Sequence, residues 1–386
     1  MPTTPLSVPG KLDHLGTTIF SVMSALAAEH QAINLSQGFP NFGCDPRLIE
    51  LVHTAMLAGH NQYAPMPGLP VLREQVASLV QACYGATYDP ATEITITCGA
   101  TEALYGVMAT FVQPGDEVIV LEPAYDAYLP AIEASGGRPV RVPLQFPDYH
   151  IDWDQVQAAI TPRTKALLLN SPHNPTGAIL RPVDIEALHD LVHRYPLMLI
   201  GDEVYEHMVF DGEAHLSLSA YPALAERSVV ISSFGKTLHT TGWKVGYALA
   251  PAQWTAAFRK VHQFMTFSVG TPFQHAIAQY LAEARDRVLG LRDFYQQKRD
   301  TFLRLMAKSR FTPLSCRGTY FQLMGYEAIS DLPEADVARW LTIEVGVAAI
   351  PVSAFYRDGT DHRVMRFCFA KDEATLAAAA DKLCQL

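Results

Sequence analysis

Residues 166–202, ALLLNSPHNPTGAILRPVDIEALHDLVHRYPLMLIGD, contain two short apolar runs on either side of a segment with helical character. The runs, residues 166–170 and 197–202, are apolar at consecutive positions, which is typical of strands buried on both faces of a sheet. Residues 184–193 between them have the length of a helix. Strand, helix and strand in this order predict a βαβ unit and therefore two parallel strands.

The same alternation of strands and helices extends over residues 94–250. Further strands are expected at residues 94–98, 117–121 and 229–232, and a further helix at 102–111. This pattern predicts an α/β large domain with a mostly parallel sheet covered by helices.

The C-terminal part of the chain has a different pattern. A long helix is expected at residues 278–308, followed by short strands at 319–324, 347–351 and 364–370 and a closing alanine-rich helix. We interpret this part as a smaller α+β domain. The expected division is an N-terminal arm with part of the small domain at 1–45, a large domain at 46–285 and a small domain at 286–386.

The composition is that of an ordinary globular protein. Of the 386 residues, 49% are hydrophobic and 18% are charged, which excludes a disordered, collagen-like or disulfide-scaffold chain. The net charge of −10 argues against a protein that mainly binds nucleic acid or anionic membrane. The longest apolar runs are far shorter than the ~20 residues that cross a bilayer, and no secretory signal is recognisable.

The cysteines and histidines do not predict a metal site. The six cysteines contain no C-x-x-C pair, so we expect reduced thiols and a cytoplasmic protein. His189 and His193 lie four residues apart on the predicted helix, as two metal ligands can. No third ligand accompanies them, and a solvated helix face is the better interpretation.

Two common phosphate-binding motifs are absent. The segment SSFGKT, residues 232–237, contains Gly-Lys-Thr, but Val230 occupies the position of the first glycine of a P-loop. A dinucleotide-binding fingerprint needs two glycines separated by one residue, and the chain has no such pair. Neither a P-loop NTPase nor a dehydrogenase of the usual kind is expected.

A different anion site is indicated after the strand at residues 94–98. Gly99, Ala100 and Thr101 begin the next helix, where small residues, a hydroxyl and free N–H groups favour an anion. Ser233 and Lys244 flank Lys236 in sequence and would supply a hydroxyl and a cation to a phosphate bound there.

Polar side chains also follow two neighbouring strands. Asn174 lies in the turn NSPHNPTG after residue 169, and Asp202 and Tyr205 lie in DEVY after the next strand. Open α/β sheets bind ligands outside the carboxyl ends of their strands. A pyridine aldehyde cofactor needs an amine, a carboxylate for the ring nitrogen, hydrogen-bond donors for the ring oxygen and a phosphate cup. The sequence has a candidate for each.

Together these segments resemble the class I aminotransferases of fold type I, which depend on pyridoxal 5′-phosphate. The resemblance covers nearly the whole chain and rests on INLSQGFPNF, NQYAP, TCGATEAL, EPAYDAY, SFGKTLHTTGWKVGY and RFCFAK. It is closest to the methionine aminotransferases and to the kynurenine and glutamine transaminases. Lys244 stands where the broad class usually has arginine, and the kynurenine-type enzymes also have lysine there.

The resemblance implies roles for the residues around the cofactor ring. Lys236 would bond to the cofactor aldehyde and act as the base that moves the proton. Burial and neighbouring cations should lower the pKa of its amine. Asp202 would hold the ring nitrogen protonated, Asn174 and Tyr205 would bind the ring oxygen, and Tyr125 would stack on the ring.

It also implies the residues that hold the phosphate and the substrate. Gly99, Ala100, Thr101, Ser233 and Lys244 would bind the phosphate, joined by Tyr63 from the neighbouring subunit of a homodimer. Arg366 would hold the substrate α-carboxylate, assisted by Asn174 and Gly38. Phe20, Tyr63 and Phe267 would form an apolar pocket for the donor side chain.

The expected activity is transfer of an amino group from an L-amino acid to a 2-oxo acid through a ping-pong cycle of the cofactor. Methionine is the favoured donor, because an apolar pocket accepts a thioether or aromatic side chain more readily than a second carboxylate. Phenylalanine, tyrosine, glutamine and kynurenine follow as further donors, because such a pocket separates these side chains only weakly. Two alternatives stay open: a β-lyase acting on cysteine S-conjugates, and a non-catalytic regulator that binds the cofactor. The regulator is disfavoured because no DNA-binding segment or basic patch is present.

Overall fold

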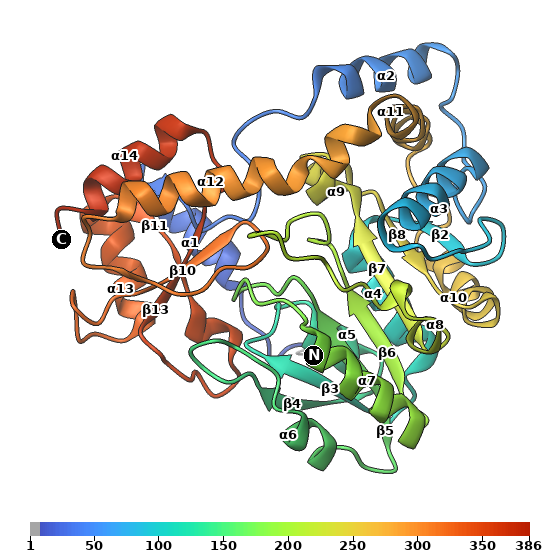
Figure 1. Cartoon of the computed structure of the whole chain (residues 1–386), viewed down its shortest axis with the longest axis horizontal. Coiled ribbons are helices and arrows are strands. Elements are labelled where there is room, and N and C mark those ends of the chain that lie inside the picture. Colours follow the sequence, from blue (N-terminus) through green and yellow to red (C-terminus); the bar gives the residue numbers. More distant parts are fainter. Residues whose placement is uncertain (1–7) are drawn as a thin grey trace, which may run out of the picture.

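The structure is a computed structural model that describes residues 8–386. Its centre is a seven-stranded sheet with the strand order β2-β8-β7-β6-β5-β3-β4 (Figure 1). The strands are β2 (Ile94–Thr97), β3 (Glu117–Glu122), β4 (Arg138–Pro143), β5 (Thr164–Asn170), β6 (Met198–Asp202), β7 (Ser228–Ser233) and β8 (Gly246–Leu249). Only β8 runs antiparallel to its neighbours, so the predicted mostly parallel sheet is confirmed.

Helices from the same part of the chain surround this sheet, most of them packed on its two faces and α2 packed on α11. They are α2 (Pro46–Leu57), α3 (Pro70–Tyr84), α4 (Gly99–Phe111), α5 (Tyr128–Ala134), α6 (Trp153–Ala158), α7 (Pro182–Arg194), α8 (Pro222–Ala225), α9 (Phe234–Thr237), α10 (Ala252–Met265) and α11 (Thr271–Leu289). Short 3₁₀ turns lie at Leu218–Ala220 and Thr241–Trp243. The strands and helices expected from the βαβ pattern are all present.

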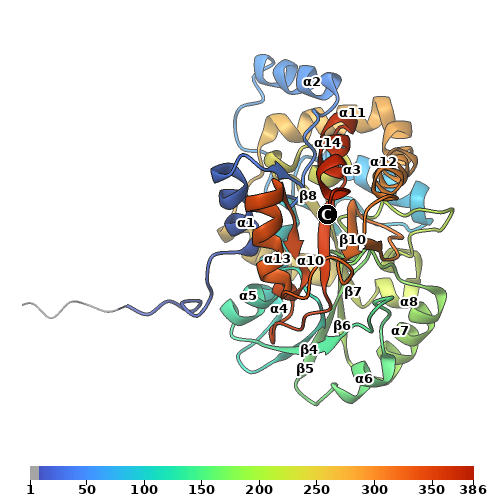
Figure 2. The same ribbon diagram turned by 90° about the vertical axis from the view of Figure 1, so that its left-hand side faces the viewer.

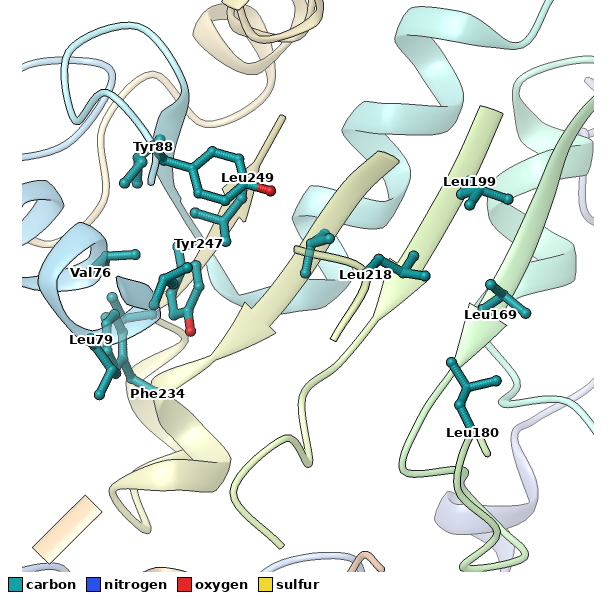
Figure 3. Packing of buried hydrophobic residues seen from close by; sticks show 14 of the residues in the cluster. Val76, Leu79, Tyr88, Leu169, Leu180, Leu199, Leu218, Phe234, Tyr247 and Leu249 are labelled. Atoms are coloured by element: carbon teal, nitrogen blue, oxygen red, sulfur yellow. The ribbon is translucent and has the colours of Figure 1, made fainter. Parts of the chain in front are cut away.

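The consecutive apolar residues of β5 explain why both sheet faces are buried. Leu167 and Leu169 belong to the apolar cluster on one face, and Ala166 and Leu168 belong to the cluster on the other. Successive side chains of a strand point to opposite faces, so each face receives every second residue. Figure 3 shows Leu169 among the buried side chains of the first cluster.

The C-terminal part forms a separate, four-stranded antiparallel sheet with the order β12-β13-β10-β9. The helices and strands of this C-terminal part are α12 (Leu291–Met306), β9 (Thr312–Pro313), β10 (Phe321–Gly325), α13 (Glu334–Trp340), a π-helical turn (Leu341–Val345), β11 (Val347–Ala348), β12 (Ile350–Pro351), a 3₁₀ turn (Val352–Phe355), β13 (Val364–Cys368) and α14 (Glu373–Leu383). The expected strands and the closing helix are found at these positions.

The beginning of the chain packs against this C-terminal part. Helix α1 (Ile19–Glu29) lies beside α13 (Figure 2), and β1 (Ile33–Asn34) pairs in parallel with β11. Met23, Leu26 and Leu35 share one apolar cluster with side chains of β10, β13 and α14. The domain limits at residues 45 and 285 stay a prediction.

The prediction of a single long helix at residues 278–308 is wrong. The structure has two helices there, α11 and α12, which meet at Gly290. Ala284 inside α11 also leaves helical geometry, with φ −137° and ψ 34°. The residues on both sides favour helix, so composition did not reveal the change of direction. Within residues 8–386, no helix combines the length and apolar character needed to span a membrane.

Candidate active site

A cavity of about 350 Å³ opens at the carboxyl ends of β5, β6 and β7 and the start of α4. Most of the residues predicted for the site line it: Phe20, Gly38, Gly99, Ala100, Thr101, Tyr125, Asn174, Asp202, Tyr205, Ser233, Lys236, Lys244 and Arg366. The βαβ topology accounts for this convergence, since parallel strands end at the same edge of a sheet.

Lys236 lies on α9, the short helix that directly follows β7. Its Nζ donates hydrogen bonds to the hydroxyl of Tyr320 (2.9 Å) and the carbonyl oxygen of Gly38 (3.1 Å). Burial, reinforced by the nearby Arg366 and Lys244, lowers the pKa of the amine to about 8. The amine is therefore far more readily deprotonated than an exposed lysine.

Asp202 is the last residue of β6, and its side chain is buried. Oδ2 accepts a hydrogen bond of 2.7 Å from the hydroxyl of Tyr128, and Oδ1 accepts one of 3.3 Å from the backbone N–H of Val204. Burial raises the pKa of the Asp202 carboxyl to about 6, although both hydrogen bonds and Lys236 act in the opposite direction. A cationic partner in the cavity would favour the ionised carboxylate.

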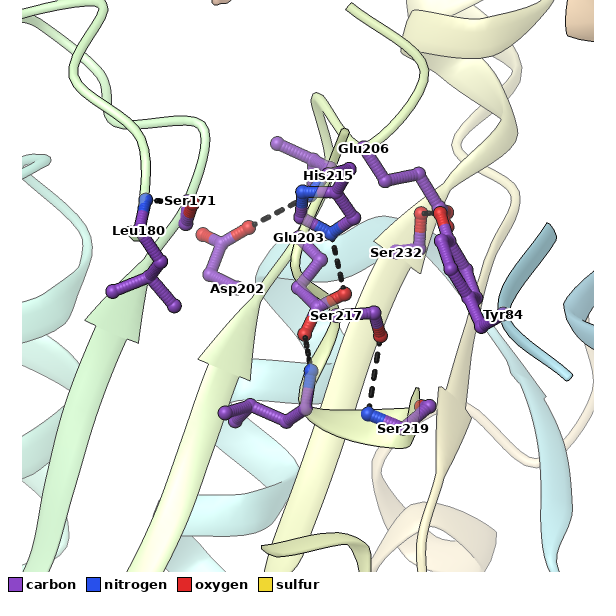
Figure 4. A network of polar contacts seen from close by, with 12 residues as sticks. Tyr84, Ser171, Leu180, Asp202, Glu203, Glu206, His215, Ser217, Ser219 and Ser232 are labelled. Atoms are coloured by element: carbon purple, nitrogen blue, oxygen red, sulfur yellow. Dashed lines mark hydrogen bonds and ion pairs between the residues drawn. The ribbon is translucent and has the colours of Figure 1, made fainter. Parts of the chain in front are cut away.

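The segment after Asp202 is held by a buried polar network, shown in Figure 4. Glu203 pairs with Nε2 of His215 at 2.8 Å. Glu206 accepts hydrogen bonds from the hydroxyls of Tyr84 (2.5 Å) and Tyr247 (2.7 Å). These contacts connect the segment after β6 to α3 and β8, and they give the end of the strand a fixed position.

Arg366 on β13 connects the C-terminal part of the chain to the cavity. Its Nη1 donates to Oδ1 of Asn174 (2.7 Å) and its Nη2 donates to the carbonyl of Ser36 (2.8 Å). The guanidinium lies 3.9 Å from the ring centre of Phe321. Burial lowers the pKa of Arg366 to about 10, so the group is charged at neutral pH. Asn174 is itself held by Asn170, whose Oδ1 accepts from its backbone N–H at 2.8 Å.

The start of α4 lines the cavity and has features that suit an anion. Gly99 has a φ of +74°, and a Cβ atom there would lie 3.4 Å from Nζ of Lys244. The glycine thus allows the lysine to approach the helix N-terminus, where N–H groups and the helix dipole also favour negative charge. Oγ of Ser233 accepts from the N–H of Gly235 at 3.1 Å and faces the same cavity.

The residues present fit pyridoxal phosphate. The cavity has an anion-binding end, a buried carboxylate and a lysine amine on its wall. Arg366 also lines the cavity, and its Nε is buried and has no hydrogen-bond partner, as expected of a group that awaits a further acceptor. Among residues 8–386, no group of three or more His, Cys, Asp or Glu side chains is arranged to hold a metal ion.

Two predicted residues do not line the cavity of this chain. Tyr63 and Phe267 pack edge to face with ring centres 5.2 Å apart, and 81% of Tyr63 is exposed. Phe20 does line the cavity, with its ring 6.3 Å from that of Tyr125 and 5.7 Å from that of Phe355. Their assigned roles, including the contribution of Tyr63 across a subunit interface, stay predictions.

Sequence reasoning missed Tyr128, Asn170 and Tyr320. Tyr128 follows Tyr125 in EPAYDAY by three residues, close to one helical turn, and that spacing was the available signal. Asn170 is the last residue of β5 and begins the polar segment NSPHNPTG. No sequence pattern indicated a role for Tyr320, because its segment is far from Lys236 in sequence and its hydroxyl contacts the lysine only in the folded chain.

Comparisons with known proteins identify the family of this chain. Residues 30–383 match the family model for aminotransferase class I and II. The chain is 49% identical to the methionine aminotransferase of Escherichia coli over the full length of both, and 35% identical to the kynurenine–oxoglutarate transaminase of Dictyostelium discoideum over 96% of this chain and 94% of that one.

The similarity extends to three dimensions. The crystal structure of YbdL from Escherichia coli, for which a methionine aminotransferase function is identified, superposes with a TM-score of 0.97. The two sequences are 49% identical, and the superposition covers 99% of this chain and 100% of YbdL. The chain with the Lys236, Asp202 and Arg366 cavity therefore belongs to the class I and II aminotransferases.

Proposed function

We propose that this aminotransferase uses pyridoxal 5′-phosphate to move the amino group of L-methionine to a 2-oxo acid in a ping-pong cycle. The observation that supports this most strongly is the convergence of Lys236, Asp202 and Arg366 on one cavity with an anion-binding end. The 49% identity to a methionine aminotransferase supports the choice of donor.

When bound, pyridoxal phosphate would supply an aldehyde that condenses with amines and a pyridine ring that accepts the electron pair released at the substrate α-carbon. Gly99, Ala100, Thr101, Ser233 and Lys244 would hold the phosphate. Their hydroxyls, backbone N–H groups and cation suit an anion at a helix start.

Asp202 would keep a proton on the ring nitrogen, since the ionised carboxylate is the form that a buried cation stabilises. Asn174 and Tyr205 would donate to the ring oxygen, and Tyr125 would cover one ring face. Lys236 would take the proton from the substrate α-carbon, for which its lowered pKa suits it.

Arg366 would bind the substrate α-carboxylate and so orient the α-carbon relative to Lys236. The guanidinium is charged, buried and fixed by Asn174 and the Ser36 carbonyl, while its Nε still lacks a partner. A planar cation that is already held in position loses little further conformational entropy when it binds a carboxylate.

The donor side chain would extend toward Phe20, which lies against Phe355 and Tyr125. These rings favour a thioether or an aromatic group over a second carboxylate. Phenylalanine, tyrosine, glutamine and kynurenine remain further candidate donors because an apolar pocket discriminates among them weakly. The kynurenine transaminase relative supports a range of this kind.

We further propose a homodimer in which Tyr63 of one subunit reaches the phosphate of the other, with Phe267 near the donor pocket. The exposure of Tyr63 and its contact with Phe267 on the surface support this arrangement. A cytoplasmic location also stays a prediction, and the six cysteines are all free thiols.

The absorption spectrum of the purified protein, before and after L-methionine is added without any 2-oxo acid, tests the proposal. We expect the visible band of the lysine-bound cofactor to disappear and one 2-oxo acid to form per active site. A band that methionine leaves unchanged would exclude this donor, and no band after adding pyridoxal phosphate would exclude the cofactor. Release of pyruvate and ammonia from a cysteine S-conjugate, without a 2-oxo acid acceptor, would instead indicate the β-lyase alternative.

A further inference from the structure

Tyr320 lies directly against Lys236 although it comes from the C-terminal part of the chain. Its side chain is fully buried and is surrounded by other rings. The ring centres of Tyr205, Phe321 and Tyr295 lie 5.1, 4.9 and 5.6 Å from that of Tyr320. Packed aromatic side chains have few alternative rotamers, so the Tyr320 hydroxyl has a defined position.

The hydrogen bonds around this hydroxyl have a fixed direction. Tyr320 donates its proton to the carbonyl oxygen of Gly38. A phenol has one proton, so its oxygen can only accept from Lys236, whose Nζ lies 2.9 Å away. The Gly38 carbonyl, 3.1 Å from the same Nζ, is also an acceptor. Both hydrogen-bond partners of the Lys236 nitrogen are therefore acceptors.

This arrangement fixes the orientation of the amine when it is neutral. A neutral amine has two N–H bonds and one lone pair, and the two acceptors occupy both N–H bonds. The lone pair then points away from Tyr320 and Gly38. Lys236 lines the same cavity as Asp202 and Arg366, to which the proposed function assigns the cofactor ring and the substrate carboxylate, so the α-carbon would be bound in the cavity that Lys236 lines.

We propose that Tyr320 is a positioning residue that, with the Gly38 carbonyl, holds the Lys236 amine and orients its lone pair toward the substrate α-carbon. This inference rests on the proposed role of Lys236 as the base. In the step, Lys236 would take the proton of the substrate α-carbon, so the α-carbon to hydrogen bond would break and a third N–H bond would form on Nζ. The bound cofactor would supply the acceptor for the electron pair of the broken bond. Lys236 then returns the proton to the former aldehyde carbon of the cofactor and is neutral again.

The kinetic test compares Tyr320→Phe with Tyr295→Phe. The hydroxyl of Tyr295 is buried in the same cluster and has no hydrogen-bond partner, so its removal is a matched control. We expect Y320F to lower kcat on the order of tenfold or more with every donor. The kinetic isotope effect with α-deuterated methionine should rise, because proton transfer becomes more strongly rate-limiting. Y295F should behave as the wild type does.

A second readout uses the cofactor-free protein. The pH dependence of acylation of Lys236, followed by mass spectrometry, reports the pKa of its amine. An ammonium group donates more strongly than a neutral amine, so loss of the Tyr320 oxygen should lower this pKa in Y320F and leave it unchanged in Y295F. This labelling also works if the wild type proves unable to transaminate, so failure of the proposed function is distinguishable from failure of this inference.

A Y320F enzyme with the isotope effect and labelling pKa of the wild type would overturn the proposal, as would equal losses in Y320F and Y295F. If Y320F does not fold, 3-fluorotyrosine at position 320 provides the same test. Fluorine makes the phenol oxygen a weaker acceptor, so the labelling pKa of Lys236 must fall. An unchanged value would contradict the contact.

Discussion

The hydroxyl of Tyr128 donates a hydrogen bond of 2.7 Å to Oδ2 of Asp202, and the side chains of both residues are buried. Tyr128 begins α5, whereas Asp202 ends β6. The contact orients a carboxylate that must face a ligand on its other side. It also favours the ionised carboxyl, because a hydrogen bond donated to an anion stabilises it.

Tyr128→Phe should weaken catalysis without changing the chemistry. Loss of a hydrogen bond to a charged group costs about 1.5–3 kcal/mol, so we expect kcat/KM to fall roughly 10- to 150-fold. The pKa of Asp202 should rise, which moves the acid limb of the kcat profile to higher pH. Tyr149→Phe is the control, since its buried hydroxyl has no partner. A Y128F profile that coincides with the wild-type profile would contradict the role of Tyr128.

Asp202→Asn should abolish transamination and yet stabilise the cofactor-free protein. The pKa of Asp202 in the folded chain is about 6, above its value of 3.8 when unperturbed. Its contribution to stability is thus fully present below pH 4 and is lost as the pH rises through 6. The pKa shift corresponds to about 3 kcal/mol in the free energy of unfolding. At pH 8 D202N should therefore be more stable than the wild type by about this amount.

Urea unfolding of the two cofactor-free proteins at pH 4 and pH 8 measures this difference. The advantage of D202N should increase by about 3 kcal/mol between the two pH values. A constant difference would show that burial does not disfavour the ionised form of Asp202. With saturating pyridoxal phosphate the order of stability should reverse, because only the wild-type carboxylate pairs with the ring nitrogen.

The fold was largely predictable because its decisive signal is local. Consecutive apolar residues such as Leu167 and Leu168 identify a strand buried on both faces, and this pattern recurs with helices between the strands. The break at Gly290 was not predicted, because a turn between two strongly helical segments leaves little trace in composition.

The candidate site was predictable where its residues end a strand, as Asp202 does, or lie in the first turn of a helix, as Thr101 and Lys236 do. Residues that hold these groups in position were less predictable from the sequence. Tyr320 approaches Lys236 from 84 residues away in sequence, through the packing of the C-terminal part against the large sheet. Such a contact depends on tertiary structure, and a single sequence contains no periodic signal for it.

Substitution of Arg366 should lower kcat/KM for every amino-acid donor by a similar factor. Removing a buried charged partner of a carboxylate costs about 2–5 kcal/mol, so R366A should lower kcat/KM at least ~30-fold with methionine, phenylalanine and glutamine alike. R366K should recover only part of this loss, since an ammonium cannot form the planar two-point contact. Steady-state kinetics with the three donors tests this. A loss confined to one donor would place Arg366 in the side-chain pocket instead.

Hybrid dimers should show whether Tyr63 acts across a subunit interface. A Tyr63→Ala subunit retains Lys236, and a Lys236→Ala subunit retains Tyr63, so each is inactive or weak by itself. If Tyr63 serves the neighbouring site, every hybrid contains one site with both residues intact and one with neither. Random mixing makes half of the dimers hybrids, so activity should recover to about a quarter of the wild-type value. If Tyr63 serves its own subunit, both sites of each hybrid are damaged and mixing restores nothing. Co-expression with two affinity tags, followed by purification through both, isolates the hybrids for this measurement.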